Sequence, residues 1–428
     1  MREILIEQNQ HWDNQKYLNL SIKRAVMPKF ISYLPLKQII TITGIRRCGK
    51  STLARQAINY LIESGVPKEN IFFINLENPY FLEYKHDATF LNTIYEEYLK
   101  LMNPKGKIYC FFDEIQYFDN WQVYIKSKYE SSDIKYIITG SNSSMLSHEL
   151  ATLLSGRSLN IHLDTFSFTE FLDFKEIDYK SEFATIKNRI DIARAKEEYL
   201  KWGGFYEVFE INNEMSKKEI LISYAKNIIY QDIIPRYGIR NSEIVERLFF
   251  YLLTTVTGVL NYTTLAKTFD VSDKTIKEYI NYFEDVFLFK RIDKFHTKLK
   301  EKIKSTKKIF VLDNGFLQIV PTHSKNLGTS LENEVFKILN KSCDKVTYIK
   351  ENCEIDFRCD DGLYQVNYKM EDEKTRAKEL RAFSSFDEAN RYQHRLVNYD
   401  ESSIEGSTEI VKFEDFVFGL ENQLENNK

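Results

Sequence analysis

The sequence has no long hydrophobic run and almost no net charge. No stretch reaches the ~18 apolar residues of a membrane-spanning helix. The first residues lack the apolar segment and the small-residue cleavage site of a signal peptide. We therefore expect a cytoplasmic protein with no membrane partner. The 59 Lys and Arg residues against 62 Asp and Glu residues give a net charge of -3, so the whole molecule carries no strong field towards nucleic acid.

Cysteine is also scarce. The odd number of cysteines in a chain of 428 residues argues against a disulfide framework. Cys353 and Cys359 lie close in sequence, but no nearby His or Cys pair completes a zinc set. The five are Cys48, Cys110, Cys343, Cys353 and Cys359.

The composition excludes disordered and collagen-like chains, because 43% of the residues are hydrophobic and 28% are charged. The length corresponds to two or three domains of about 150 residues each. Between residues 38 and 139, short apolar runs alternate with segments of helix length. The runs cover residues 38–43, 71–76, 108–113 and 134–139. This alternation predicts a parallel sheet with helices on both faces.

A phosphate-binding loop follows the first predicted strand. Residues 44–51 match G-x-x-x-x-G-K-[ST] and lie between a strand and a helix. Backbone N–H groups of such a loop wrap the phosphates, Lys50 places a cation on the β- and γ-phosphates, and the Ser51 hydroxyl binds Mg²⁺. The alternative is a turn that merely contains glycines. The predicted ATP contacts are Gly44, Ile45, Arg46, Arg47, Cys48, Gly49, Lys50, Ser51 and Thr52.

The second half of a nucleotide site lies on the strand that ends in two carboxylates, Asp113 and Glu114. This pattern is typical of a Walker B strand. Asp113 would hold Mg²⁺, and Glu114 would orient and deprotonate the attacking water. The alternative is an acidic strand end that faces solvent.

Three further residues are candidates for contact with the γ-phosphate. Ser141 and Asn142 follow the next buried strand, where a γ-phosphate sensor would lie, although this segment also fits a plain strand-to-loop turn. Arg157 would stabilise transition-state charge in its own site or in a neighbour's. A surface position or a structural ion pair explains Arg157 as well, and Arg236 is a weaker candidate.

With these residues, the chain resembles the bacterial and archaeal AAA-type ATPases that join an AAA_14 domain to a C-terminal DUF4143 domain. The resemblance implies an ATPase core, a winged-helix segment and a C-terminal domain similar to the restriction-endonuclease-like fold. It rests on residues 42–53, 112–116, 139–143, 155–157 and 166–172, and on later landmarks at 202–205 and 328–335.

Residues 261–289 have the apolar spacing of a helix-turn-helix, with the turn at Asp270-Val-Ser. Residues 289–309 carry a local net charge of +7, because they contain nine basic residues and only two acidic ones, Asp293 and Glu301. DNA phosphates would be the natural partner of residues 261–309. A protein-contact module or a solvated basic face are the alternatives. The nine are Lys290, Arg291, Lys294, Lys298, Lys300, Lys302, Lys304, Lys307 and Lys308.

The last domain contains part of a metal-dependent nuclease pattern. Glu332 and Asp356 are suitably placed, but Gln365 stands where a carboxylate is needed and Asn367 where a lysine is needed. An amide cannot supply the anionic ligand that a hard divalent cation favours. Lys369 is poorly placed to replace the lysine. We therefore expect a degenerate nuclease fold that acts as a binding or structural module.

The sequence thus predicts an α/β protein: a P-loop ATPase domain at 1–165, a helical region at 166–242, a winged-helix domain at 243–320 and a degenerate nuclease-fold domain at 321–428. The favoured function is Mg²⁺-dependent ATP hydrolysis that controls a C-terminal DNA- or protein-binding module. An ATP-gated regulatory module with little turnover is the second hypothesis, and a metal-dependent nuclease is the third. A homo-oligomer would fit, because AAA-type sites often lie between subunits.

Overall fold

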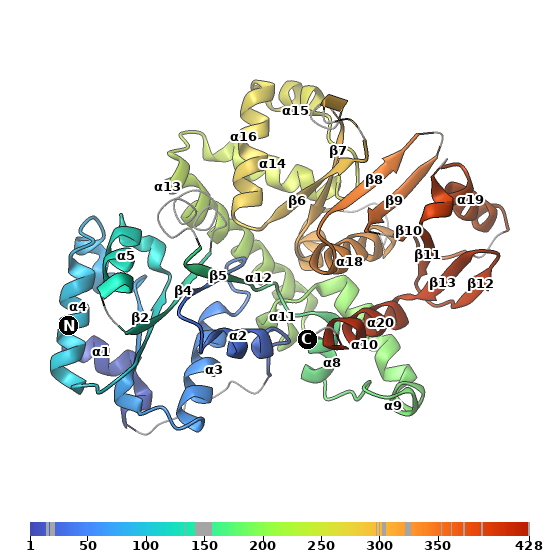
Figure 1. The fold of residues 1–428 in the computed structure, drawn as a ribbon. Helices are drawn as coiled ribbons and strands as arrows, with labels where there is room; N and C mark the ends of the chain where they lie inside the picture. The colour runs from blue at the N-terminus through green and yellow to red at the C-terminus, as the bar shows by residue number, and fades with distance from the viewer. Residues whose placement is uncertain are drawn as a thin grey trace. The chain divides into compact units, whose positions relative to one another are not determined.

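The structure is a computed structural model that describes residues 1–426 except 14–16, 18–21, 132, 142–155, 297, 299, 302–304, 322–326, 352, 361, 371–372 and 387. The chain divides into two compact units (Figure 1). The first contains residues 1–165 and 285–287, and the second contains residues 166–284 and 288–428. No helix within the described ranges combines the length and the apolar composition needed to cross a membrane.

The first unit is built on a five-stranded parallel sheet with the strand order β2-β3-β4-β1-β5. The predicted parallel sheet is confirmed, and all four predicted strands are present. The edge strand β5 was not predicted, because it is short and mostly polar and only Ile161 is buried. The strands are β1 Ile39–Thr43, β2 Ile71–Asn75, β3 Ile108–Asp113, β4 Ile134–Gly140 and β5 Ser158–His162.

Aromatic side chains form much of the core of this unit. The ring of Phe72 stacks on Tyr98 with 4.6 Å between centroids, and that of Phe112 stacks on Tyr136 at 6.0 Å. Leu53, Ala57 and Leu61, one turn apart, make the buried face of the helix that follows β1. The helices are α1 Arg2–Gln8, α2 Met27–Tyr33, α3 Lys50–Glu63, α4 Phe90–Met102 and α5 Trp121–Ser131.

The second unit begins with helices, as predicted for residues 166–242. A capping box starts the first of them: the Ser167 hydroxyl accepts from the Glu170 N–H, and the Glu170 carboxylate accepts from the Ser167 N–H. The helices are α8 Phe168–Phe174, α9 Glu182–Lys187, α10 Arg189–Trp202, α11 Tyr206–Phe209, α12 Glu214–Asn227, the π-helix Ile228–Ile233 and α13 Ile234–Tyr237.

Three helices follow: α14 Ser242–Thr254, α15 Tyr262–Phe269 and α16 Asp273–Asp285. The last two lie in the segment where the spacing of a helix-turn-helix was predicted. Asp270 adopts a left-handed conformation at the end of α15, so the chain turns at the predicted position. Leu265, Ala266, Ile276 and Ile280 are buried.

A mixed eight-stranded sheet completes the unit, with the order β12-β13-β11-β10-β9-β8-β6-β7. The antiparallel pair β6–β7 joins this sheet through β8. Strands before and after residue 320, where a domain boundary was predicted, therefore share one sheet. The domain boundaries themselves stay predictions. The strands are β6 Phe289–Lys294, β7 Lys307–Val311, β8 Val346–Lys350, β9 Glu354–Cys359, β10 Gly362–Asn367, β11 Gln393–Asn398, β12 Ser403–Glu405 and β13 Thr408–Lys412. The helices are α18 Leu327–Ser342, α19 Glu373–Ser384 and α20 Phe413–Asn426.

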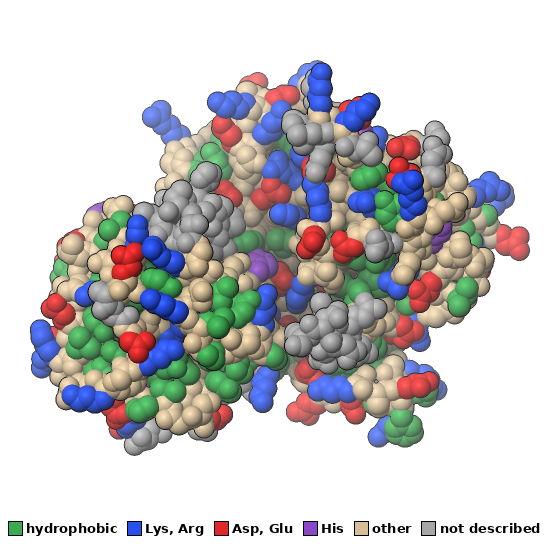
Figure 2. Space-filling model, in the orientation of Figure 1, with side chains coloured by type: hydrophobic (Ala, Val, Ile, Leu, Met, Phe, Trp, Pro, Cys, Tyr) green, Lys and Arg blue, Asp and Glu red, His purple; other side chains and the backbone are tan. Residues whose placement is uncertain are grey.

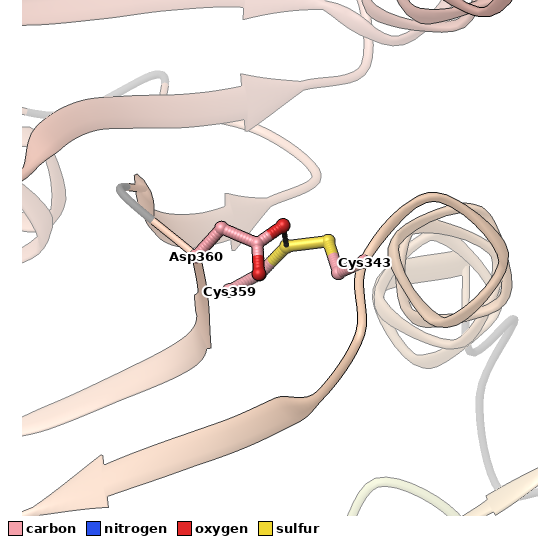
Figure 3. Close-up of side chains that lie close together, drawn as sticks. All are labelled: Cys343, Cys359 and Asp360. Carbon is pink, nitrogen blue, oxygen red and sulfur yellow. Dashed lines mark hydrogen bonds between the residues drawn. A yellow bond between two sulfur atoms is a disulfide. The ribbon is translucent and has the colours of Figure 1, made fainter.

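A disulfide joins Cys343 to Cys359, whereas the odd cysteine count argued against disulfides. Cys343 directly follows α18 and Cys359 ends β9, so the fold brings together two cysteines that lie 16 residues apart. Asp360 lies beside them (Figure 3). Because the two sulfurs are bonded to each other, they are not thiolate ligands, and we do not assign a metal to this group.

Candidate functional site

The phosphate-binding loop connects β1 to α3 and depends on its two glycines. A Cβ atom at Gly44 would lie 2.0 Å from the carbonyl oxygen of Leu163, so only glycine fits there. Gly49 has φ of +99° and caps the N-terminus of α3, a conformation that side chains disfavour. The loop N–H groups thus precede the positive end of a helix, where phosphate binds favourably.

Lys50 is buried at the start of α3. Its ammonium donates to the carbonyl oxygens of Gly44 at 3.1 Å and Ile45 at 3.3 Å, and lies 3.6 Å from the Glu114 carboxylate. Arg24 braces the other side of the loop by donating to the Cys48 carbonyl at 2.7 Å. No sequence pattern indicated this role for Arg24, because it lies 20 residues before the loop in an irregular segment.

Asp113 and Glu114 end β3, which is separated from β1 by β4. Thr139 of β4 bridges both acidic residues: its hydroxyl donates to Asp113 at 2.6 Å and accepts from the Glu114 N–H at 3.0 Å. Ser51 also hydrogen-bonds to Asp113. The side chains expected to act together are therefore assembled, with Thr139 as a link that the sequence did not indicate.

The environment of Asp113 is unusual for a carboxylate. Burial and then the neighbouring charge of Glu114 raise its pKa to about 6, against the opposing effects of Thr139, Ser51 and Lys50. Glu114 adopts a left-handed backbone conformation with φ of 53°. Such strain in a non-glycine residue is concentrated at functional sites.

Gln116 connects Glu114 to Ser141. Its side-chain amide donates to the Glu114 carboxylate at 2.5 Å and to the Ser141 hydroxyl at 3.3 Å. Asn75, at the end of β2, donates to Asp113 at 3.4 Å. The sequence reasoning missed both residues, although each follows a buried strand closely. Asn142 lies outside the described residues.

The other residues of the phosphate-binding loop differ in the exposure and the contacts of their side chains. The side chains of Ile45 and Cys48 are buried, so only their backbone can reach a ligand, and burial raises the pKa of the Cys48 thiol. Arg46 forms an ion pair with Glu77, and Arg47 is exposed. Thr52 lies in the first turn of α3.

Arg157 does not lie at this site within its own chain. It precedes β5, and its carbonyl accepts from the N–H of Ile39 at the start of β1. The phosphate-binding loop follows the C-terminal end of β1, whereas Arg157 is bonded to the N-terminal end. Arg157 therefore lies at the opposite ends of the parallel strands from the loop. Its guanidinium pairs with Glu130 at 3.0 Å. Arg236 lies in α13, in the second unit.

The predicted basic footprint in the second unit is partly neutralised. Arg291 binds Glu284 at 3.0 Å, Lys307 pairs with Asp293, and Lys308 is buried among carboxylates. The expectation that Lys308 contacts DNA is therefore wrong. Lys302 and Lys304 lie outside the described residues, whereas Lys290, Lys298 and Lys300 are exposed. Basic and acidic side chains alternate over the face drawn in Figure 2.

The predicted nuclease residues lie near one another in the second unit. Glu332 of α18 and Asp356 of β9 both approach Lys308 of β7. Burial and then the charge of Asp356 raise the pKa of Glu332 to about 8. Gln365 and Asn367 of β10 donate instead to Glu379. Lys369 follows β10, and its N–H donates to the Asn367 side chain.

Two family models match the chain. The model described as AAA domain matches residues 36–172, which supports the resemblance to AAA-type ATPases. The model described as Domain of unknown function (DUF8612) matches residues 193–328. The expectation of a DUF4143 domain is therefore corrected to DUF8612.

Two relatives are similar to most of the chain. An uncharacterized protein of Methanocaldococcus jannaschii, MJ1544, is 31% identical over 394 residues, which are 89% of this chain and 84% of the relative. An uncharacterized protein of Haemophilus influenzae is 31% identical over 355 residues, 80% of this chain and 86% of the relative.

Two solved structures are similar to the chain at a low level. The Aeropyrum pernix ORC1 protein in complex with DNA has a TM-score of 0.34 and 10% identity, covering 69% of this chain and 90% of that one. AMPPCP-bound DnaA from Aquifex aeolicus has a TM-score of 0.27 and 16% identity, covering 60% and 86%. These scores are too low to carry a functional conclusion.

Proposed function

Because the chain belongs to the same family as the uncharacterized M. jannaschii protein MJ1544 and contains an AAA domain, we propose that it is a Mg²⁺-dependent ATPase. One observation carries the proposal. Ser51 of α3 bonds to Asp113 at the end of β3, and Thr139 of β4 links Asp113 to Glu114 directly beside the phosphate-binding loop. A simple glycine turn would not require this assembly.

The proposed roles follow from the positions of the side chains. Backbone N–H groups of residues 44–52 bind the ATP phosphates, and Lys50 compensates their charge. The Ser51 hydroxyl and the Asp113 carboxylate offer the oxygen ligands that Mg²⁺ prefers. When bound, Mg²⁺ would neutralise phosphate oxygens.

Glu114 is proposed to take the proton of the attacking water. Its carboxylate is held between the Lys50 ammonium and the Gln116 amide, so it faces the phosphate-binding loop in a fixed orientation. Ser141 is proposed to contact the γ-phosphate, as is Asn142. Since Arg157 lies at the opposite edge of its own sheet, we propose that it acts only in the site of a neighbouring copy, if the protein assembles.

For the second unit we propose that the nucleotide state controls binding of DNA by α15, α16 and the exposed lysines that follow them. The spacing of the two helices and the exposure of Lys290, Lys298 and Lys300 support this proposal. A protein partner remains the competing hypothesis. An ATP-gated module with little turnover is the competing hypothesis for the first unit.

Replacing Glu114 by Gln tests the ATPase proposal. Loss of a general base lowers turnover by about 100-fold or more, while ATP binding should persist because Lys50 and the loop are unchanged. Steady-state phosphate release and ATP titration measure the two effects. Lys50→Ala is the control that should lose both. Turnover that is unchanged in Glu114→Gln would remove Glu114 from the role. Wild-type protein that binds ATP tightly without turnover would favour the ATP-gated module.

A further inference from the structure

Lys308 brings a buried positive charge into the acidic cluster of the second unit. Its side chain is 4% exposed, and its ammonium lies 2.8 Å from Glu354, 3.2 Å from Glu332 and 3.4 Å from Asp356. The three carboxylates come from α18 and β9, whereas Lys308 comes from β7. Three carboxylates around one ammonium form a complete cation site whose occupant belongs to the chain itself.

The nuclease-like fold expected for this domain implies a divalent cation at Glu332 and Asp356, but the side chains do not fit one. Divalent cations lie 2.0–2.6 Å from their oxygen ligands, whereas the carboxylates here make hydrogen bonds and ion pairs to an ammonium. The second Asp356 oxygen accepts from the Val366 N–H at 3.0 Å. Both oxygens of the principal ligand candidate are therefore already engaged.

The strand that should supply the remaining metal groups is also occupied. The Gln365 amide donates to Glu379 at 2.6 Å, and its carbonyl oxygen accepts from the Asp356 N–H at 3.3 Å. Asn367 donates to the same Glu379 carboxylate at 3.3 Å. A divalent cation would have to enter beside a buried ammonium of the same sign, which is strongly unfavourable at low dielectric.

We propose that the Lys308 ammonium takes the place of the divalent cation in this module and keeps the site closed to metal ions. The cluster then has a structural role, because Lys308 ties the β6–β7 pair to α18 and β9. The same contacts of Lys308 hold the basic segment that follows α16 to the sheet. This inference is independent of ATP hydrolysis in the first unit.

Manganese binding by the full-length, nucleotide-free protein tests the proposal. Free Mn²⁺ is measured by electron paramagnetic resonance during titration. Wild type and Asp356→Asn should bind the same number of ions, because the cluster holds none. Lys308→Met, which removes the ammonium at similar length, should bind one additional ion, and Lys308→Met/Asp356→Asn should lose it.

Lys307→Met is the matched control, because Lys307 is the next residue on β7 but pairs with Asp293. It should gain no ion. Two results would overturn the proposal: an ion bound by wild type that is lost in Asp356→Asn, or a folded Lys308→Met protein that gains none. If Lys308→Met does not fold, as judged by circular dichroism, the wild-type and Asp356→Asn pair still decides whether the site is closed.

Discussion

Gln116, beside the proposed ATP site, has a buried side-chain amide whose hydrogen bonding is incomplete. Its amide nitrogen is shared between Glu114 and Ser141, while its carbonyl oxygen is buried and has no hydrogen-bond partner among the described residues. A buried acceptor without a partner costs free energy. Because the nitrogen of the same amide binds the proposed base, we propose that this oxygen accepts a hydrogen bond from the attacking water.

We therefore predict that Gln116→Leu lowers ATP turnover by about 10-fold to 100-fold and leaves the Kd for ATP unchanged. Stopped-flow hydrolysis and ATP titration measure the two effects. A variant with altered stability but unchanged turnover would show that Gln116 has only a structural role.

For single residues, the sequence indicated which motif residues form the ATP site, but it did not indicate which other residues hold them in place. Spacing alone predicted that Lys50, Ser51, Asp113 and Glu114 would act together, because parallel strands end at one edge of a sheet. Thr139 could not be recognised, because its contacts depend on β4 lying between β1 and β3. Lys308 was misread for a similar reason: a lysine in a basic run looks exposed until the fold places carboxylates around it.

Among the elements, the end of α10 shows how a sequence landmark acquires a physical meaning. Gly203 ends this helix with φ of 72° and ψ of −153°, a region that is almost restricted to glycine. A Cβ atom there would lie 1.9 Å from a carboxylate oxygen of Asp313. That carboxylate accepts from the N–H groups of Gly204 and Gly315, both at 2.8 Å. The backbone at Gly204 and Gly315 thus surrounds the buried Asp313 carboxylate, and Gly203 leaves room for it.

Replacing Gly203 by Ala should therefore lower the free energy of unfolding by about 3 kcal/mol or more, because backbone strain adds to a direct clash. Gly238→Ala is the matched control. Gly238 also has a positive φ, of 59°, but a Cβ atom there would meet nothing within 4 Å, so about 1 kcal/mol is expected. Urea unfolding measures both. Equal losses in the two variants would contradict the role of Asp313.

The existence of elements was easier to predict than their partners. Strong apolar runs marked β1 to β4, and helical spacing marked α15 and α16. By contrast, β5 has a polar and exposed pattern, and it forms only because the β1 edge accepts it. The pairing of β6 with β8 joins residues more than 50 positions apart, so local pattern alone could not indicate that a hairpin after the three helices continues into the last sheet.

For the whole molecule, charge and connectivity decide how the two units can influence each other. The net charge is -3, so any attraction to DNA is local to the exposed lysines after α16. The chain passes between the units after residue 165 and again on both sides of residues 285–287, directly at the end of α16. The helix proposed to contact DNA is therefore followed directly in the chain by residues that belong to the ATPase unit.

We predict that duplex DNA stimulates ATP turnover and that replacing Lys290, Lys298 and Lys300 by Glu abolishes the stimulation while leaving basal turnover unchanged. The basal rate is preserved because these lysines belong to the other unit. The slope of log K against log salt should fall by about 0.9 for each lysine that contacts a phosphate. Fluorescence anisotropy at several salt concentrations measures the slope, and steady-state hydrolysis measures the stimulation.

The control for this prediction makes the same change of charge elsewhere in the second unit, at the exposed residues Lys180, Lys187 and Arg189. If both triple variants lose DNA equally, the effect comes from net charge rather than from a footprint, because a footprint depends on position whereas a general field depends on total charge. If duplex DNA neither binds nor alters turnover in wild type, the basic segment is a solvated face. The proposed output of the ATPase is then a protein partner rather than nucleic acid.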